Sequence, residues 1–415
     1  MSETPEVAPK PPRTRRVLLN SGLLGAMFLM ATSAIGPGFI TQTTEFTARL
    51  GAAFAFAILV SVLVDIAVQL NIWRVIGVAE TRAQDLANKV LPGAGYVLAA
   101  LVVFGGIVFN VGNIAGTALG LDALAGIDMK LGGALSAAVA VALFVLRGAG
   151  VALDRILVAL GVLMIGLTLY VTFVSQPPVG DALRHAVLPG RVTDDLFLAT
   201  VTLIGGTVGG YITYAGAHRL VDNGLGGIRN VGAVTQTSIV GIIVTGVMRV
   251  LLFLAVLGVV TGGAAILDSP NAPAAAFAAA AGETGRRLFG LIMWAAAISS
   301  VIGASYTSVS FISTFSAGMA RNRNWLVAAF IALCTVLFLG LGQAPATLLI
   351  LAGALNGLIL PVGLGIMLWV AARRRADLLH GYRYPAWLLG LGVLAWLVTV
   401  YIAANALGGI ADLWQ

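Results

Sequence analysis

Two stretches of the sequence combine helix-breaking residues with neutral polar side chains. Residues 33–46 read SAIGPGFITQTTEF, and residues 205–222 read GGTVGGYITYAGAHRLVD. Proline lacks an amide hydrogen and glycine has a low helix propensity, so both stretches predict an interrupted helix. The N-terminus of the helix that follows such a break has free backbone amides and a partial positive charge, so it can bind a carboxylate. Hydroxyl and amide side chains beside it would bind the neutral polar part of a ligand.

The composition defines the surroundings of these breaks. The chain has 415 residues, of which 59% are hydrophobic and 10% are charged, and its mean hydropathy is +0.99. These values are typical of an integral membrane protein. A span needs about 20 mostly apolar residues, and the pattern predicts eleven helices that begin near residues 21, 50, 95, 131, 153, 196, 231, 287, 326, 346 and 385.

The basic residues indicate how the chain is oriented. The net charge is +7, but the Lys and Arg residues are spread over the loops and are not clustered with aromatic residues, so we expect no nucleic-acid partner. Most lie in segments that would be cytoplasmic if the N-terminus is cytoplasmic, and this arrangement places the C-terminus outside. Residues 1–16 are expected to be a disordered cytoplasmic tail, followed by a retained helix. The only cysteine, Cys334, falls in an apolar span, so no intramolecular disulfide is possible.

The two broken spans are the first and the sixth. A separation of five helices is expected when two five-helix units repeat with inverted topology, and paired broken helices then form a substrate site near the bilayer midplane. We therefore expect repeats over residues 17–174 and 196–372 and an eleventh span over residues 385–407. The alternative is that the glycines only allow close helix packing. The tenth span contains Asn356, Gly357 and Pro361 and is expected to kink without a full break.

The chain resembles the NRAMP divalent-metal transporters over nearly its whole length. The resemblance rests on the Pro-Gly of the first span, on IGVAETRAQDLA at residues 76–87, on NIAGTALGLDAL at residues 113–124, on the Gly-Thr-Val run of the sixth span and on the Leu-Pro of the tenth. It implies an all-α integral membrane protein of the LeuT-type (APC superfamily) fold, with an inverted 5+5 helix repeat and an eleventh helix. It also implies secondary transport by alternating access, and no enzyme motif is present.

The sequence departs from this family at the metal site. NRAMP transporters have Asp-Pro-Gly-Asn in the first break and Met-Pro-His in the sixth span. Gly36 and Phe39 stand in place of the Asp and Asn, and residues 209–211 (Gly-Gly-Tyr) stand in place of Met-Pro-His. The acidic pair of the third span is replaced by Asn110 and Asn113, which cannot relay protons by changing charge. Divalent-cation sites normally include a carboxylate, so we predict no metal site and no cofactor.

These changes favour a small organic acid or amino-acid-like solute, carried with protons or sodium. The chain is also similar to a divergent NRAMP-like branch that is associated with 5-oxoproline use in bacteria, which makes 5-oxoproline a candidate substrate and the bacterial inner membrane the expected location. We expect a monomer. The predicted substrate-binding residues are Gly36, Gly38, Thr41, Gln42, Asn110, Asn113, Thr207, Gly209, Gly210, Tyr211, Thr213 and Tyr214. One alternative is a carrier of hydrated Mg²⁺ or Mn²⁺, and another is a membrane sensor that binds a ligand without transporting it.

Ionisable and hydroxyl residues inside spans supply further candidates, because charges at membrane depth are rare. For coupling or gating the candidates are Glu45, His218, Arg219 and Asp222, although Glu45 could instead form a structural ion pair with Arg49. Asp65 is expected to hydrogen-bond helix ends, and Arg249 is the only base well within a span. The eighth span carries Ser299, Ser300, Ser305 and Thr307, which are expected mostly to bond to the preceding helical turn.

Overall fold

The computed structural model describes residues 34–145 and 150–407, and every regular element in these ranges is a helix. The predicted tail and the beginning of the first span lie outside them. The longer helices are α2 (Pro37–Leu50), α3 (Phe54–Ala79), α5 (Ala94–Ala125), α6 (Met129–Val145), α7 (Gly150–Ser175), α9 (Asp194–Thr207), α10 (Ile212–Asp222), α11 (Val231–Thr261), α12 (Ala272–Ser313), α14 (Arg323–Leu341), α15 (Pro345–Arg373) and α16 (Ala386–Asn405). The shorter ones are α4 (Ala83–Val90), α8 (Val179–Val187), α13 (Ala317–Arg321) and the 3-10 turns η2 (Gly51–Ala53), η3 (Ile228–Asn230) and η4 (Ile266–Asp268).

The helices confirm a multi-pass membrane protein. In the described ranges, eight helical segments are long and apolar enough to cross a membrane, the pair α7–α8, bent by 106°, would make a ninth, and α6 is apolar but shorter. One of the eight, Pro37–Ala79, contains both α2 and α3. Its 43 residues would be about 65 Å long if straight, roughly twice the hydrocarbon core. Gly51 (φ 56°) turns the chain between α2 and α3, so these 43 residues do not form one straight helix.

Most predicted helix starts agree with the structure, but the start near residue 287 is wrong. α12 begins at Ala272, where the Asn271 side chain accepts a hydrogen bond from the Ala274 amide. An alanine-rich run then forms helix as far as Gly282, which has φ 63° and ψ −162°. That conformation bends the helix, so the predicted start corresponds to the segment after the bend. α15 is one continuous helix that contains Pro361, so the tenth span is not broken.

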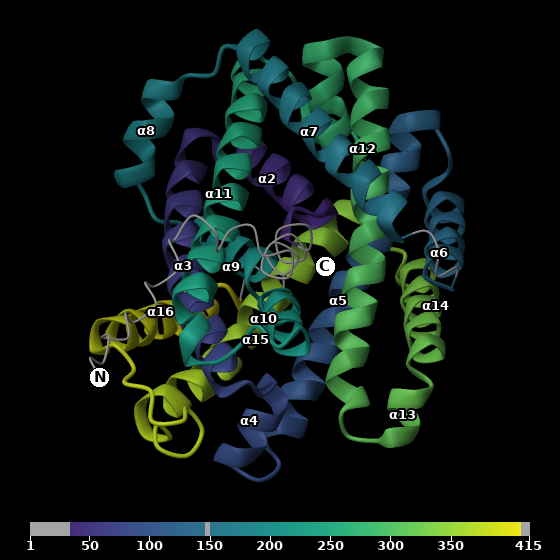
Figure 1. Cartoon of the computed structure of the whole chain (residues 1–415). Coiled ribbons are helices and arrows are strands. Elements are labelled where there is room, and N and C mark those ends of the chain that lie inside the picture. The colour runs from purple at the N-terminus through teal and green to yellow at the C-terminus, as the bar shows by residue number, and fades with distance from the viewer. Residues whose placement is uncertain (1–33, 146–149, 408–415) are drawn as a thin grey trace, which may run out of the picture.

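The centre of the bundle is formed by α2, α5, α9, α12 and α15, with α6 and α14 together on one side and α16 on the other (Figure 1). α5 and α12 pack closely because glycines line their contact. A Cβ on Gly120 would lie 2.6 Å from the Trp294 amide nitrogen, and one on Gly290 would lie 2.5 Å from the Leu124 nitrogen. Small residues at such contacts let helix backbones approach in a membrane.

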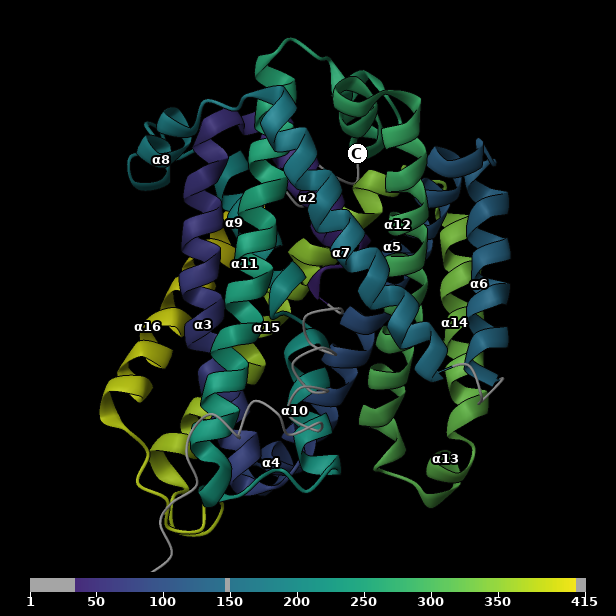
Figure 2. The ribbon, with the colours of Figure 1, turned by 45° about the horizontal axis from the view of Figure 1, so that its top comes forward.

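The two ends of the bundle carry different short helices (Figure 2). We call them the α4 end, which also holds α13, and the α8 end. Between them, α14 buries Cys334, whose Sγ lies 3.9 Å from the Ile107 carbonyl oxygen. These helices frame the broken segments.

Candidate functional site

The sixth span is broken, as predicted. α9 ends at Thr207, α10 begins at Ile212, and residues 208–211 between them are not helical. Gly210 has φ 52°, a conformation that side-chain-bearing residues rarely adopt. In the first span, α2 starts at Pro37 after an extended Gly36 (φ −100°, ψ −171°). The structure therefore shows the α2 side of the first break, and the helix half before it lies outside the described residues.

Neighbouring spans hold the two breaks in place. The Trp73 indole nitrogen on α3 donates a hydrogen bond of 2.9 Å to the Thr213 carbonyl in the first turn of α10. Gly116 on α5 lies directly against the Pro37 ring, so that any larger side chain there would overlap it. The rings of Phe109 and Tyr211 meet edge to face with centroids 5.6 Å apart. Gly116 belongs to the third-span motif at residues 113–124, so this motif includes a residue that packs against the first break.

Gln42 connects three spans beside the breaks. Its Nε2 on α2 donates a hydrogen bond of 2.8 Å to the Leu349 carbonyl on α15. Its Oε1 faces α9, where a Cβ on Gly206 would lie 2.6 Å from it. A Cβ on Gly38 would lie 3.3 Å from the Gln42 Nε2 atom. The structure thus places the predicted residue Gln42 of the first span against the sixth span, at Gly206, which was not predicted.

The third and eighth spans add amides and hydroxyls. The Asn110 Nδ2 group donates a hydrogen bond of 2.9 Å to the Ser305 hydroxyl, and the Asn113 side chain lies beside the Tyr211 hydroxyl. Ser299 and Ser305 donate to carbonyls of the preceding turn, as expected. The Ser300 hydroxyl is buried without a partner, so its role is not explained by that expectation.

Several neutral polar atoms around the breaks are buried and have no hydrogen-bond partner. They are Thr41 Oγ1, Gln42 Oε1, Asn110 Oδ1, Asn113 Nδ2, the Tyr211 hydroxyl, Thr213 Oγ1 and Asn356 Oδ1. Buried polar atoms in folded proteins are nearly always hydrogen-bonded. A cluster of them therefore indicates a site completed by a polar ligand or by water.

Asn356 also belongs to this cluster, although the sequence predicted it only as part of a kink in the tenth span. Its Nδ2 donates to the Gly105 and Ala352 carbonyls at 3.1 and 2.8 Å. Its Oδ1 fills the space that Gly210 leaves open, and a Cβ on Gly209 would lie 2.9 Å from its carbonyl oxygen. In this conformation the glycines of the break allow α15 to approach closely.

A narrow gap beside the breaks holds an acid and a base, and in this conformation it is too small for a water molecule. It is lined by Phe39, Val62, Asp65, Thr207, Thr245, Gly246 and Arg249. The Arg249 guanidinium carbon lies 4.3 Å from the centroid of the Phe39 ring. Asp65 is in the middle of α3 and faces Arg249 and Thr207, and Thr207 is the last residue of α9, so the expectation that Asp65 bonds a helix end stays a prediction.

The predicted gating residues gather at the α4 end. His218, Arg219 and Asp222 line a polar cavity of about 280 Å³ together with Ala215, Asn223, Tyr306, Thr307, Ser310 and Arg323. Asp222 pairs with Arg82 at 2.7 Å, and His218 Nε2 accepts a hydrogen bond of 3.2 Å from the Ala83 amide. Tyr214 packs above this group against Phe311, with ring centroids 5.5 Å apart. These contacts join α4, α10 and α12.

Glu45 lies away from that group, near the α8 end of α2. Its carboxylate is 3.6 Å from the Arg49 guanidinium, and the Arg49 side chain is 46% exposed. The ion pair that the sequence allowed is therefore present. The coupling role of Glu45 stays a prediction.

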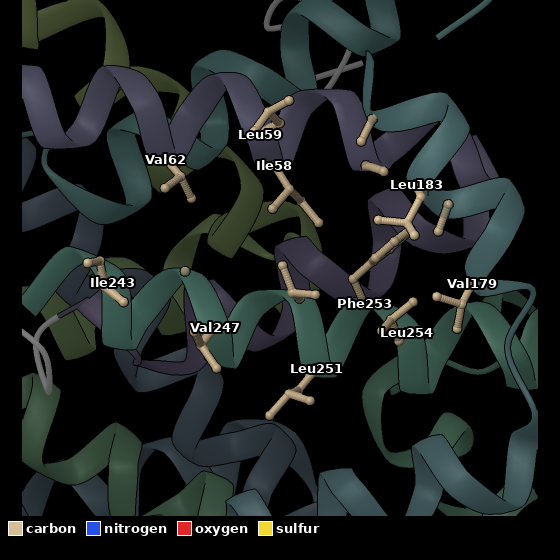
Figure 3. A pocket seen from close by; sticks show the side chains of 15 residues that line it. Ile58, Leu59, Val62, Val179, Leu183, Ile243, Val247, Leu251, Phe253 and Leu254 are labelled. Atoms are coloured by element: carbon tan, nitrogen blue, oxygen red, sulfur yellow. The ribbon is translucent and has the colours of Figure 1, made fainter. Parts of the chain in front are cut away.

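An apolar cavity of about 440 Å³ lies between α3, α8 and α11 (Figure 3). The labelled side chains that surround it are aliphatic or aromatic, among them Ile58, Leu183 and Phe253. It offers no hydrogen-bonding side chain to a polar solute, so we do not assign it to the substrate. Val62 and Gly246 line both this cavity and the narrow gap of Asp65 and Arg249.

Solved structures share this architecture. A manganese transporter from Eremococcus coleocola, in complex with an aromatic bis-isothiourea substituted compound, matches with a TM-score of 0.72 at 18% identity, over 98% of this chain and 89% of that chain. MhsT in complex with L-phenylalanine matches with a TM-score of 0.68 at 16% identity, over 92% of this chain and 98% of that chain. The all-α, LeuT-type fold is confirmed.

The sequence comparisons define the family. The family model described as "Natural resistance-associated macrophage protein-like" (Nramp) matches residues 27–408, and the chain belongs to this family. The protein is therefore a secondary transporter and not an enzyme. The uncharacterized membrane protein YcsG of Bacillus subtilis (strain 168) is 51% identical over 394 residues, which are 95% of this chain and 96% of that protein. An uncharacterized membrane protein of Haemophilus influenzae is 47% identical over 383 residues, 92% of this chain and 94% of that protein.

Proposed function

We propose that the protein carries a small organic acid or amino-acid-like solute, with 5-oxoproline as a candidate, and that protons or sodium drive this transport by alternating access. The observation that carries the proposal is the cluster of unpaired, buried, neutral polar atoms around the two breaks. Amide and hydroxyl groups of this kind match a solute that has its own hydrogen-bond donors and acceptors. The helix ends at Pro37 and Ile212 supply partial positive charge for a carboxylate.

The side chains at the breaks do not suit a bare divalent cation. Within residues 34–145 and 150–407, no group of three or more His, Cys, Asp or Glu side chains is placed to hold a metal ion. Mg²⁺ and Ca²⁺ sites normally use at least one carboxylate. Arg249 stands beside the first break and would repel a cation. MhsT, which shares the fold, was solved with the amino acid L-phenylalanine.

The second candidate is a divalent metal cation, Mg²⁺ or Mn²⁺, carried with most of its water shell. Membership of the Nramp family and the likeness to a manganese transporter favour this candidate. Gln42 Oε1, Asn110 Oδ1 and Asn356 Oδ1 are unpaired oxygens near the breaks that would accept hydrogen bonds from coordinated water.

We place the α4 end on the cytoplasmic side of a bacterial inner membrane and the C-terminus outside, from the distribution of Lys and Arg. The proposed units are a first inverted repeat over residues 17–174, a second over residues 196–372 and a separate eleventh span, in a monomer. His218, Arg219 and Asp222 then line an inner vestibule.

Uptake into liposomes tests the proposal. The purified protein is reconstituted, and uptake of 5-oxoproline, amino acids and organic acids is compared with uptake of Mn²⁺ and Mg²⁺, with and without proton or sodium gradients. We expect saturable, gradient-dependent uptake of an organic solute. Saturable metal uptake, together with no binding or transport of any organic solute, would overturn the proposal in favour of the second candidate.

A further inference from the structure

Asp65 on α3 and Arg249 on α11 form a buried pair of opposite charges next to the breaks. Asp65 is 1% exposed and Arg249 is 2% exposed. They line one narrow gap together with Phe39 in the first turn of α2 and Thr207 at the end of α9. The gap is therefore bounded by both broken spans.

Several polar atoms of the two charged groups are left without a hydrogen-bond partner. Their nitrogen and oxygen atoms do not approach within 4.0 Å, so they do not form an ion pair in this conformation. Asp65 Oδ1 and the Nε and Nη2 atoms of Arg249 are buried and accept or donate no hydrogen bond. A buried charge without a hydrogen-bonded partner is strongly unfavourable. The site is thus incomplete until another group reaches Arg249.

We propose that Arg249 binds the carboxylate of the transported solute, and that Asp65 is the counter-charge that balances Arg249 while the site is empty. This inference rests on the proposed function. A guanidinium presents a planar fork of donors that matches a carboxylate with two parallel hydrogen bonds. The Phe39 ring face supports the guanidinium at 4.3 Å and holds it next to the amide end of α2.

The placement gives each end of the solute its own partners. On binding, the narrow gap must widen so that the carboxylate lies between Arg249 and the start of α2. The uncharged part is then directed toward the Gln42, Asn110 and Tyr211 atoms that lack partners. Asp65 opposes the carboxylate, so an acidic solute competes with Asp65 for Arg249. A cation cannot use Arg249 in this way.

Ligand chemistry provides the first test. Binding of 5-oxoproline and of its primary amide, which has the same ring but no negative charge, is measured on the purified full-length protein. We expect the wild-type protein to bind the acid at least ten-fold more tightly than the amide. Arg249→Gln is expected to weaken binding of the acid by about 30-fold or more and to leave binding of the amide unchanged. Arg287→Gln, at a side chain that is 63% exposed, is the control and is expected to bind like the wild type.

Two further variants separate binding from folding. Arg249→Gln alone leaves Asp65 buried and unbalanced, whereas the double variant Asp65→Asn/Arg249→Gln removes both charges and is expected to fold without binding the acid. Asp65→Asn alone is expected to bind the acid more tightly than the wild type. Binding of the acid that is unchanged in the double variant overturns this inference and leaves the proposed function intact. If no carboxylate binds to the wild-type protein, the proposed function fails, and the inference fails with it.

Discussion

The Arg249 guanidinium carbon lies 4.3 Å from the centroid of the Phe39 ring, so a charge on the seventh span rests on the first turn after the break of the first span. Phe39 stands where the resemblance to metal transporters places a ligand. At the position where the resemblance implies a metal ligand, the structure has an aromatic side chain in contact with a guanidinium.

Two tyrosines are expected to respond in opposite ways to removal of their hydroxyl groups. The Tyr211 hydroxyl is buried without a hydrogen-bond partner, so Tyr211→Phe should leave thermal stability unchanged or raised and weaken solute binding about ten-fold, by loss of one hydrogen bond. Tyr384 donates to Asn71 Oδ1 at 2.7 Å, away from the breaks. Tyr384→Phe should lower stability by about 1 kcal/mol and leave binding unchanged. Thermal unfolding and ligand binding of the two variants give the comparison.

Glu45 is expected to link transport to an ion gradient. Glu45→Gln should abolish the stimulation of liposome uptake by a proton or sodium gradient. Arg49→Gln is the matched control, because it removes the same 3.6 Å ion pair and keeps the carboxylate. If both variants lose the stimulation equally, the ion pair and not the carboxylate is responsible, and Glu45 has no coupling role.

The ion pair of Arg82 and Asp222 is expected to hold the α4 end closed. Asp222→Asn should change the free energy of unfolding by less than about 1 kcal/mol, since both side chains are partly exposed. Amides of α4 and α10 should nevertheless exchange hydrogen for deuterium faster. The charge-swapped double variant Arg82→Asp/Asp222→Arg should restore slow hydrogen–deuterium exchange. If the wild type, Asp222→Asn and the double variant exchange these amide hydrogens equally fast, the Arg82–Asp222 ion pair does not hold the α4 end closed.

Gly210 is expected to tolerate no side chain. Gly210→Ala should lower the free energy of unfolding by about 1–3 kcal/mol, because its φ of 52° is strained for alanine and its Cβ would overlap Asn356 Oδ1. Gly340→Ala is the control: Gly340 lies within α14 with open space around it, and there alanine should stabilise by up to about 1 kcal/mol. Thermal unfolding in detergent measures both. A stable Gly210→Ala protein would show that the break is not fixed by this glycine.

The sequence predicted the helices better than their contacts. Gly-Gly-Tyr in the sixth span identified its break, because glycine at such a density is incompatible with a stable helix. The bend of α12 at Gly282 was missed, since a single glycine after an alanine-rich run gives no sign that it will adopt a positive φ.

The proximity of Asp65 to Arg249 could not be predicted for a different reason. Each residue was recognised as a rare charge inside a span, but the sequence does not say which faces of α3 and α11 meet. Asn356 was read only as a source of a kink for the same reason. Its contact with Gly210 depends on how closely α15 approaches the broken span, which is a property of tertiary packing.

The burial of Cys334 has a practical consequence for following the transport cycle. It is the single cysteine of the chain, and its side chain is 0% exposed. Reagents that label cysteine should therefore leave the natural protein nearly unlabelled. Spin or fluorescent probes on cysteines introduced at Leu183 on α8 and Trp325 on α14, which are 68% and 79% exposed, would report distances between the two sides of the bundle with little signal from the native thiol.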